Sequence, residues 1–196
     1  MTTERKIKLI LGSSSLARKK VLAEAGFVFE TMSPDIDEKA IRSDNFNELV
    51  LTIGQAKMDA LLANNTFAPD TIIITSDFVT SCNGKLREKP ISPEEARMWH
   101  QEYSNGEALC HCSVVVHHVG LNKTLKEVTN ASILWEEIPE RVIEEIVADP
   151  YTYEVAGFTN EAFFHYTKRI DGAIDTVLGL PLRNLRKFLE ELGYYN

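Results

Sequence analysis

Five consecutive residues constrain the fold of this chain more than any other feature. Residues 71–75, Thr-Ile-Ile-Ile-Thr, are all β-branched, and such a run is typical of a β-strand that is buried on both faces. Strand and helix patterns alternate through the first half of the chain, and two long strand patterns follow. This order predicts an α/β fold with a mixed sheet that is flanked by helices.

The remaining elements are predicted from apolar spacing and from the positions of glycine and proline. No internal repeat or low-complexity run is visible, so the whole chain, 1–196, is predicted to be a single domain. The predicted strands are 7–11, 27–32, a hairpin over 79–87 that turns at Asn83-Gly84, 109–119 and 124–135, and the predicted helices are 15–26, 47–62, 93–103, one from Pro139 and one from Pro181.

Charge and composition exclude several classes of protein. The chain carries 21 basic and 29 acidic residues, a net charge of −8, which argues against a nucleic-acid-binding surface. No segment reaches the roughly 20 consecutive apolar residues of a membrane helix, and the first six residues are polar. Three cysteines are too few for a disulfide framework. These features predict a cytoplasmic protein with neither membrane nor nucleic acid as a partner.

A stretch of small residues between the first strand and the first helix is a candidate phosphate-binding loop. It follows Gly12 and contains Ser13 and Ser15, with Arg18 one turn into the helix. Backbone N–H groups and the helix N-terminus attract a phosphate there, and a guanidinium can hold its oxygens as a fork. The alternative is that Ser15 only caps the helix.

Charged side chains beside apolar elements are the other candidates. Asp77 follows the buried strand, where ligands of open α/β sheets bind, although an aspartate there can also cap a turn. Lys57 borders the apolar face of its helix, where a lysine usually extends only its stem. The acidic run 35–38 offers oxygen ligands for a hard cation such as Mg²⁺, and the segment 87–90 carries two cations. Solvated surface is the alternative for both runs.

Two other constellations are rejected. Neighbouring residues on a strand point to opposite faces, so the cysteines and histidines between 110 and 118 do not predict a zinc site. They are Cys110, His111, Cys112, His117 and His118. No Gly-x-Ser-x-Gly segment supports a serine nucleophile. The cysteines are predicted to be small buried apolar residues.

Taken in order, the candidate segments resemble the Maf family of nucleotide pyrophosphatases over nearly the whole chain. Each match is short, and the signal lies in seven matches in one order at compatible spacing. The matching segments are 13–18, 35–38, 55–57, 74–77, the pair 83–84 with 89–90, 105–113, and Gly179-Leu180-Pro181.

The resemblance implies a fold with two lobes around a central cleft, similar to that of inosine triphosphatases. It also implies hydrolysis of a nucleoside triphosphate between the α- and β-phosphorus atoms, Mg²⁺ or Mn²⁺ as cofactor, and a homodimer as an assembly common in the family. The implied roles are phosphate binding for Ser13, Ser15 and Arg18, charge stabilisation for Lys57 and Lys89, metal binding and water orientation for Asp77 with Glu38, and a position near the base or the metal for Glu161.

Departures from the family pattern leave alternatives open. Leu16 and Ala17 replace the proline and first arginine of the family's motif, and Glu88 replaces the glycine before Lys89. The segment 155–161, which ends in glutamate, and the Ser-Asp pair at 76–77 favour the 7-methylguanosine-triphosphate subfamily over the thymidine/uridine-triphosphate one. The rivals are a pyrophosphatase of the inosine-triphosphate type and a catalytically weak, nucleotide-binding regulator of cell division.

Overall fold

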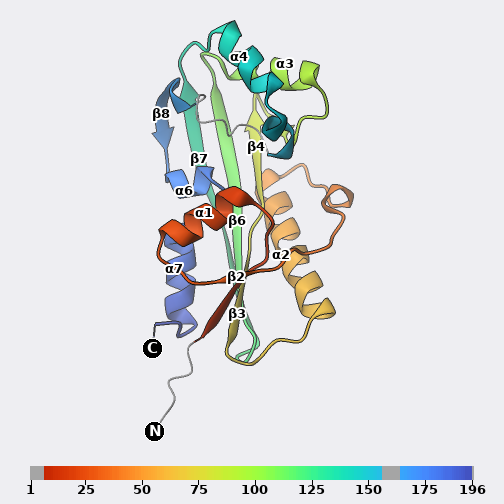
Figure 1. Ribbon diagram of the computed structural model, residues 1–196, viewed down its shortest axis with the longest axis vertical. Helices are drawn as coiled ribbons and strands as arrows, with labels where there is room; N and C mark the ends of the chain where they lie inside the picture. The colour runs from red at the N-terminus through yellow and green to blue at the C-terminus, as the bar shows by residue number, and fades with distance from the viewer. Residues whose placement is uncertain (1–6, 156–163, 196) are drawn as a thin grey trace. The chain divides into compact units, whose positions relative to one another are not determined.

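The computed structural model describes residues 7–155 and 164–195 (Figure 1). Within them the strands form one eight-stranded mixed sheet, so the predicted α/β class is confirmed. The chain divides into two compact units, in keeping with the two predicted lobes. Unit 1 comprises Met1–Asp77, Cys112–Thr129 and Leu178–Asn196, and unit 2 comprises Phe78–His111 and Asn130–Val177. The cleft implied by the resemblance stays a prediction, as does the single domain.

Unit 1 is built around the buried β-branched run, which forms strand β3 as predicted. β1 pairs in parallel with β2 on one side and with β3 on the other, and β3 pairs antiparallel with β6. All five residues of β3 are buried. The elements are β1 (Lys8–Leu11), α1 (Leu16–Glu24), β2 (Glu30–Thr31), the 3₁₀ turn η1 (Glu38–Ala40), α2 (Phe46–Asn64), β3 (Thr71–Thr75) and α7 (Leu182–Glu191).

Helices cover both faces of this part of the sheet, which explains why β3 can be apolar on both sides. Leu9 and Leu11 of β1 pack in the cluster that contains α1 and α7 residues. Ile10, between them, packs with Met58 and Leu61 of α2. This alternation follows from the two-residue period of a strand, and α1 and α7 lie across the sheet from α2 (Figure 1).

Unit 2 has its own core, formed mainly by aromatic and β-branched residues such as Trp99, Tyr103 and Trp135. The elements of unit 2 are β4 (Phe78–Cys82), β5 (Lys85–Arg87), α3 (Pro93–Tyr103), α4 (Glu140–Ala148), the 3₁₀ turn η2 (Pro150–Glu154), β8 (Thr167–Asp171) and α6 (Ile174–Val177). Two strands, β6 (Glu107–His118) and β7 (Lys123–Trp135), contribute residues to both units. The β4–β5 hairpin turns at Asn83 and Gly84, both with positive φ, as the Asn-Gly pair predicts.

Most predicted elements agree with the structure to within a few residues, and β2 is the main correction. The strand predicted over 27–32 is reduced to Glu30–Thr31, because Phe27 and Phe29 pack into the core as loop residues. β8, α6 and the two 3₁₀ turns were not predicted, since they are short and carry no long apolar period. Among the described residues, no helix is long and apolar enough to cross a membrane.

Candidate active site

Asp77 lies two residues beyond the end of β3, and it is buried, with 4% of its surface exposed. Its carboxylate Oδ1 accepts a hydrogen bond from Lys57 Nζ at 2.7 Å. The same ammonium group lies 3.0 Å from Glu38 Oε1. Lys57 therefore bridges two carboxylates, and the structure brings together three residues that were predicted from separate segments.

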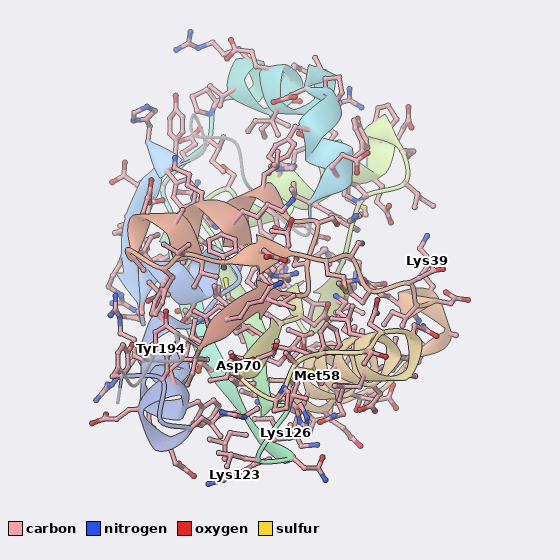
Figure 2. The ribbon with its side chains drawn as sticks, turned by 60° about the horizontal axis from the view of Figure 1, so that its bottom comes forward. Lys39, Met58, Asp70, Lys123, Lys126 and Tyr194 are labelled. Carbon is pink, nitrogen blue, oxygen red and sulfur yellow. The ribbon has the colours of Figure 1, made fainter. Side chains whose placement is uncertain are left out.

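The position of Lys57 follows from the amphipathic pattern of α2. Its neighbours Ile53 and Leu61, one turn away on either side, are core residues, so the lysine is on the buried face of the helix. Only 5% of Lys57 is exposed, and the ion pairs satisfy a charge that would otherwise be costly to bury. The alternative for Lys57, a side chain that extends its charge into solvent, is therefore wrong. Lys39, the residue after Glu38, does extend outward into solvent (Figure 2).

Burial and the nearby positive charges act in opposite directions on the pKa of Asp77. Loss of water around the carboxyl raises its pKa above the usual 3.8, while the positive charges of Lys57 and Arg18 lower it and Glu38 raises it. Burial is the largest of these causes, so the net shift is upward. Buried titratable groups with specific charged partners are characteristic of functional sites.

The serine-rich loop between β1 and α1 holds Arg18 in place. Arg18 Nε donates to the Gly179 carbonyl at 2.9 Å, and Nη1 donates to Ser13 Oγ at 3.3 Å. Ser13 is buried, and its hydroxyl oxygen also accepts the N–H of Ser15. Ser15 Oγ accepts the N–H of Arg18 at 3.4 Å, so the predicted capping role of Ser15 is confirmed.

The chain approaches closely at the start of this loop. A Cβ on Gly12 would lie 2.6 Å from Leu61 Cδ1 and 2.7 Å from Thr75 Cγ2. A larger residue at this position would have to displace the side chains of Leu61 and Thr75, so glycine lets β1 end against both α2 and β3. This contact fixes where the loop begins, and with it the position of Ser13.

Three residues that sequence reasoning gave no role lie around Asp77. Ser76 Oγ is 2.7 Å from the carbonyls of both Ser113 and Gly179. Ser113 Oγ accepts the N–H of Asp77 at 3.0 Å. The sequence signal for Ser113 is that it ends the segment 105–113 of the resemblance, and for Gly179 it is the Gly-Leu-Pro segment.

Two predicted site residues are not joined to this cluster. Lys89 is exposed and belongs to unit 2, and its role in charge stabilisation stays a prediction. Glu161 lies outside the described residues. The neighbouring Arg87 is buried and pairs with Glu102, with its guanidinium over the Trp99 ring. This contact holds the end of β5, from which Lys89 follows.

Two carboxylates at the site, those of Asp77 and Glu38, could serve as ligands of a divalent metal. Asp77 and Glu38 both direct an oxygen at one cation, the ammonium of Lys57. Mg²⁺ is usually held by one or two carboxylates together with substrate phosphates and water, and this pair fits that requirement. No group of three or more histidine, cysteine, aspartate or glutamate residues able to hold a metal occurs in the part of the chain that the structure describes.

The cysteines are buried, and two histidines of β6 contact hydroxyl groups of neighbouring strands. Cys82, Cys110 and Cys112 are buried, as predicted. His111 Nε2 is 3.0 Å from Ser81 Oγ, and His117 Nδ1 is 2.8 Å from Thr124 Oγ1.

This chain is similar to known proteins over almost its full length. The family model described as "Maf-like protein" matches residues 8–192. A protein of Dictyostelium discoideum named 7-methyl-GTP pyrophosphatase is 38% identical over 94% of this chain and 97% of its own. A dTTP/UTP pyrophosphatase of Vibrio vulnificus strain YJ016 is 28% identical over 94% and 98%. Among solved structures, a HAM1 protein from Coxiella burnetii aligns with a TM-score of 0.47 and 11% identity, covering 94% of this chain and 99% of that one.

Proposed function

Since this chain belongs to the Maf family, we propose that it is a nucleoside triphosphate pyrophosphatase, a hydrolase that releases a nucleoside monophosphate and pyrophosphate. The observation that carries the proposal is the buried Lys57 between Asp77 and Glu38. A fixed carboxylate beside a fixed cation is suited to orienting water and stabilising phosphate charge. The inosine-triphosphate rival is set aside because the family match is to Maf.

Asp77 is assigned to the attacking water. In its ionised form the carboxylate accepts a hydrogen bond from that water and orients it in line with the leaving pyrophosphate. Lys57 favours the ionised form of Asp77, because its charge lowers the pKa that burial raises. Lys57 is also assigned to stabilise the negative charge that develops on the phosphate oxygens.

Phosphate binding is assigned to the loop at the N-terminus of α1. Arg18 is held by Gly179 and Ser13 with its guanidinium fixed in one orientation, which suits an oxygen-rich chain. Ser13 accepts two hydrogen bonds through its oxygen, and its hydroxyl proton serves as a donor to a phosphate. Ser15 completes the proposed phosphate contacts, and Lys89 is proposed, like Lys57, to stabilise developing negative charge.

Asp77 and Glu38 are the residues that would hold Mg²⁺ or Mn²⁺, and Glu161 is proposed near the base or the metal. When bound, a divalent ion supplies charge neutralisation to the triphosphate and lowers the pKa of a coordinated water. The oligomer is proposed to be a homodimer and the compartment the cytoplasm.

The proposed substrate is 7-methyl-GTP. It is supported by the relative of that name at 38% identity, against 28% for the dTTP/UTP relative. The test is pyrophosphate release from 7-methyl-GTP, GTP, dTTP and UTP with Mg²⁺ or Mn²⁺, and again with a chelator. We expect the highest kcat/KM for 7-methyl-GTP and loss of activity with the chelator. GTP is the matched control because it lacks only the methyl group. Preference for dTTP and UTP would move the chain to the pyrimidine subfamily.

The carboxyl group of Asp77 is expected to titrate above pH 3.8 in the protein without metal. Burial is the largest influence on its pKa and raises it. The ionised form, which accepts a hydrogen bond from water, therefore increases as the pH rises through this raised pKa, rather than through the ordinary aspartate value. The measurement is ¹³C NMR of the side-chain carboxyl carbons from pH 3 to pH 8, with Asp77→Asn to assign the signal. A midpoint at or below pH 3.8 contradicts the raised pKa.

Arg18→Ala is expected to lower kcat/KM by about 100-fold, because a charge-assisted fork to the phosphates is lost. Both KM and kcat should change, since the phosphates are charged in the ground state and in the transition state. Lys20→Ala is the control: Lys20 is a cation in the same helix, but it is exposed. Equal kcat/KM for Arg18→Ala and Lys20→Ala would show that Arg18 does not contact the substrate.

A nucleotide-binding regulator of cell division stays the second candidate. The features that favour it are Ala17 and Glu88, which replace an arginine and a glycine of the family pattern. It predicts nucleotide binding with no pyrophosphate release from any triphosphate.

A further inference from the structure

We propose that Ser113 and Thr75 are positioning residues for the Lys57–Asp77 pair, and that their hydroxyl groups hold helix α2 against the end of β3 and the middle of β6. The catalytic consequence rests on the proposed function, while the contacts themselves do not. Both residues are fully buried, and a buried hydroxyl is costly unless it is hydrogen-bonded. The hydrogen bonds of the two hydroxyl groups therefore show which parts of the chain these residues hold together.

Ser113 holds both the backbone of Asp77 and the helix. Its Oγ accepts the N–H of Asp77 at 3.0 Å, and its own N–H donates to the Asp77 carbonyl at 2.9 Å. The hydroxyl proton goes to the Val50 carbonyl of α2 at 2.8 Å. One side chain thus connects the residue assigned to the water with the helix that carries Lys57.

Thr75 makes a second connection one turn further along the helix. Its Oγ1 donates to the Gly54 carbonyl at 2.7 Å. Val50, Gly54 and Lys57 are spaced i, i+4 and i+7, so they share one face of α2. The two hydroxyls therefore hold two successive turns of the face from which Lys57 reaches Asp77.

The absence of a side chain at Gly54 makes this close approach possible. A Cβ there would lie 2.6 Å from Ser113 Oγ and 3.3 Å from Val115 Cγ2. Real Cβ atoms do not approach that closely, so a larger residue would displace the Ser113 hydroxyl from its hydrogen bonds or push α2 away from β6. The helix glycine, which lowers intrinsic helix stability, is explained by this contact.

The test compares two substitutions of Thr75 that change opposite properties. Thr75→Val keeps the volume and removes the hydrogen bond, whereas Thr75→Ser keeps the bond and removes a methyl group. Positioning predicts that Thr75→Val lowers kcat about tenfold with KM within about twofold, and that Thr75→Ser stays near wild type. Ser113→Ala should behave like Thr75→Val. If Thr75 only fills space, Thr75→Ser is the impaired variant and the proposal is overturned.

Amide hydrogen exchange of residues 50–57 gives a readout that needs no activity. We expect faster exchange in Thr75→Val and Ser113→Ala than in wild type and Thr75→Ser. The matched control is Thr152→Val: Thr152 is a buried residue of unit 2 whose hydroxyl donates to the Ile146 carbonyl at 2.6 Å. It should leave both kcat and the exchange of 50–57 unchanged.

The two readouts separate this inference from the proposed function. A wild-type protein with no turnover would refute the pyrophosphatase assignment, and hydrogen exchange would still test the hold on α2. Unchanged exchange in both Thr75→Val and Ser113→Ala would refute the hold on α2, whatever the activity.

Discussion

Lys57→Met is expected to lower kcat/KM by about 10³-fold, the loss typical of removing one preorganised electrostatic group. Lys57 is the largest of the charges that lower the pKa of Asp77. Without it the buried carboxyl titrates at higher pH, so a smaller fraction of the enzyme is in the form that orients water. Methionine fills similar space, which keeps the packing of α2 near native. The measurement is steady-state pyrophosphate release by purified, folded variant.

The same variant should lose stability in a pH-dependent way. Removing one partner of a buried ion pair typically costs about 3 kcal/mol or more near neutral pH. In Lys57→Met the folded-state pKa of Asp77 lies further above that of the unfolded chain. Protonated Asp77 is therefore favoured in the fold, and stability present at low pH is lost as the pH rises through the raised pKa. Urea unfolding at pH 5 and pH 8 measures this difference.

Lys39→Met is the control for the loss of a lysine next to the same acidic segment. Lys39 is exposed and extends outward (Figure 2). Its removal should leave the free energy of unfolding near that of wild type and kcat/KM within about twofold. If Lys57→Met is no worse than Lys39→Met, the buried ammonium has no part in catalysis.

Asp77→Asn is expected to lower kcat by about 10³-fold or more, with the fold retained. Asparagine has nearly the same shape and can still accept a hydrogen bond from Lys57, but it cannot act as a base toward water. Substrate contacts of Arg18 and Ser13 are untouched, so nucleotide binding should persist. The measurements are kcat by pyrophosphate release and nucleotide affinity by calorimetry.

Asp59→Asn is the matched control for Asp77→Asn. Asp59 lies on α2 but is exposed and accepts a hydrogen bond from Gln55 at 2.8 Å. It should leave kcat unchanged. An Asp77→Asn variant that retains wild-type kcat would show that Asp77 does not activate the water.

Local patterns were sufficient for most of the fold. The β-branched run 71–75 gave β3 at its observed bounds, and Pro93 and the Asn83-Gly84 pair placed α3 and the hairpin. These segments are determined by their own side chains. The length of β2 was overestimated, because Phe27 and Phe29 look like strand residues but are loop residues that pack, partly buried, against the core.

The residues of the site were predicted, but the contacts between them were not. The resemblance named Asp77 with Glu38 and, in another role, Lys57. The structure adds that the ammonium group of Lys57 bridges both carboxylates. Ser113 was missed because its partners, Asp77 and Val50, are 36 and 63 residues away in sequence. Hydrogen bonds between residues so far apart leave no periodic signal in a single sequence.

The most direct test of the proposed function is the identity of the products. 7-Methyl-GTP should be incubated with the wild-type protein and Mg²⁺, and the phosphorus species followed by ³¹P NMR. Hydrolysis between the α- and β-phosphorus atoms predicts pyrophosphate and 7-methyl-GMP in equal amounts. Orthophosphate with a nucleoside diphosphate, or unchanged triphosphate across 7-methyl-GTP, GTP, dTTP and UTP, would contradict the assignment of this chain as a pyrophosphatase.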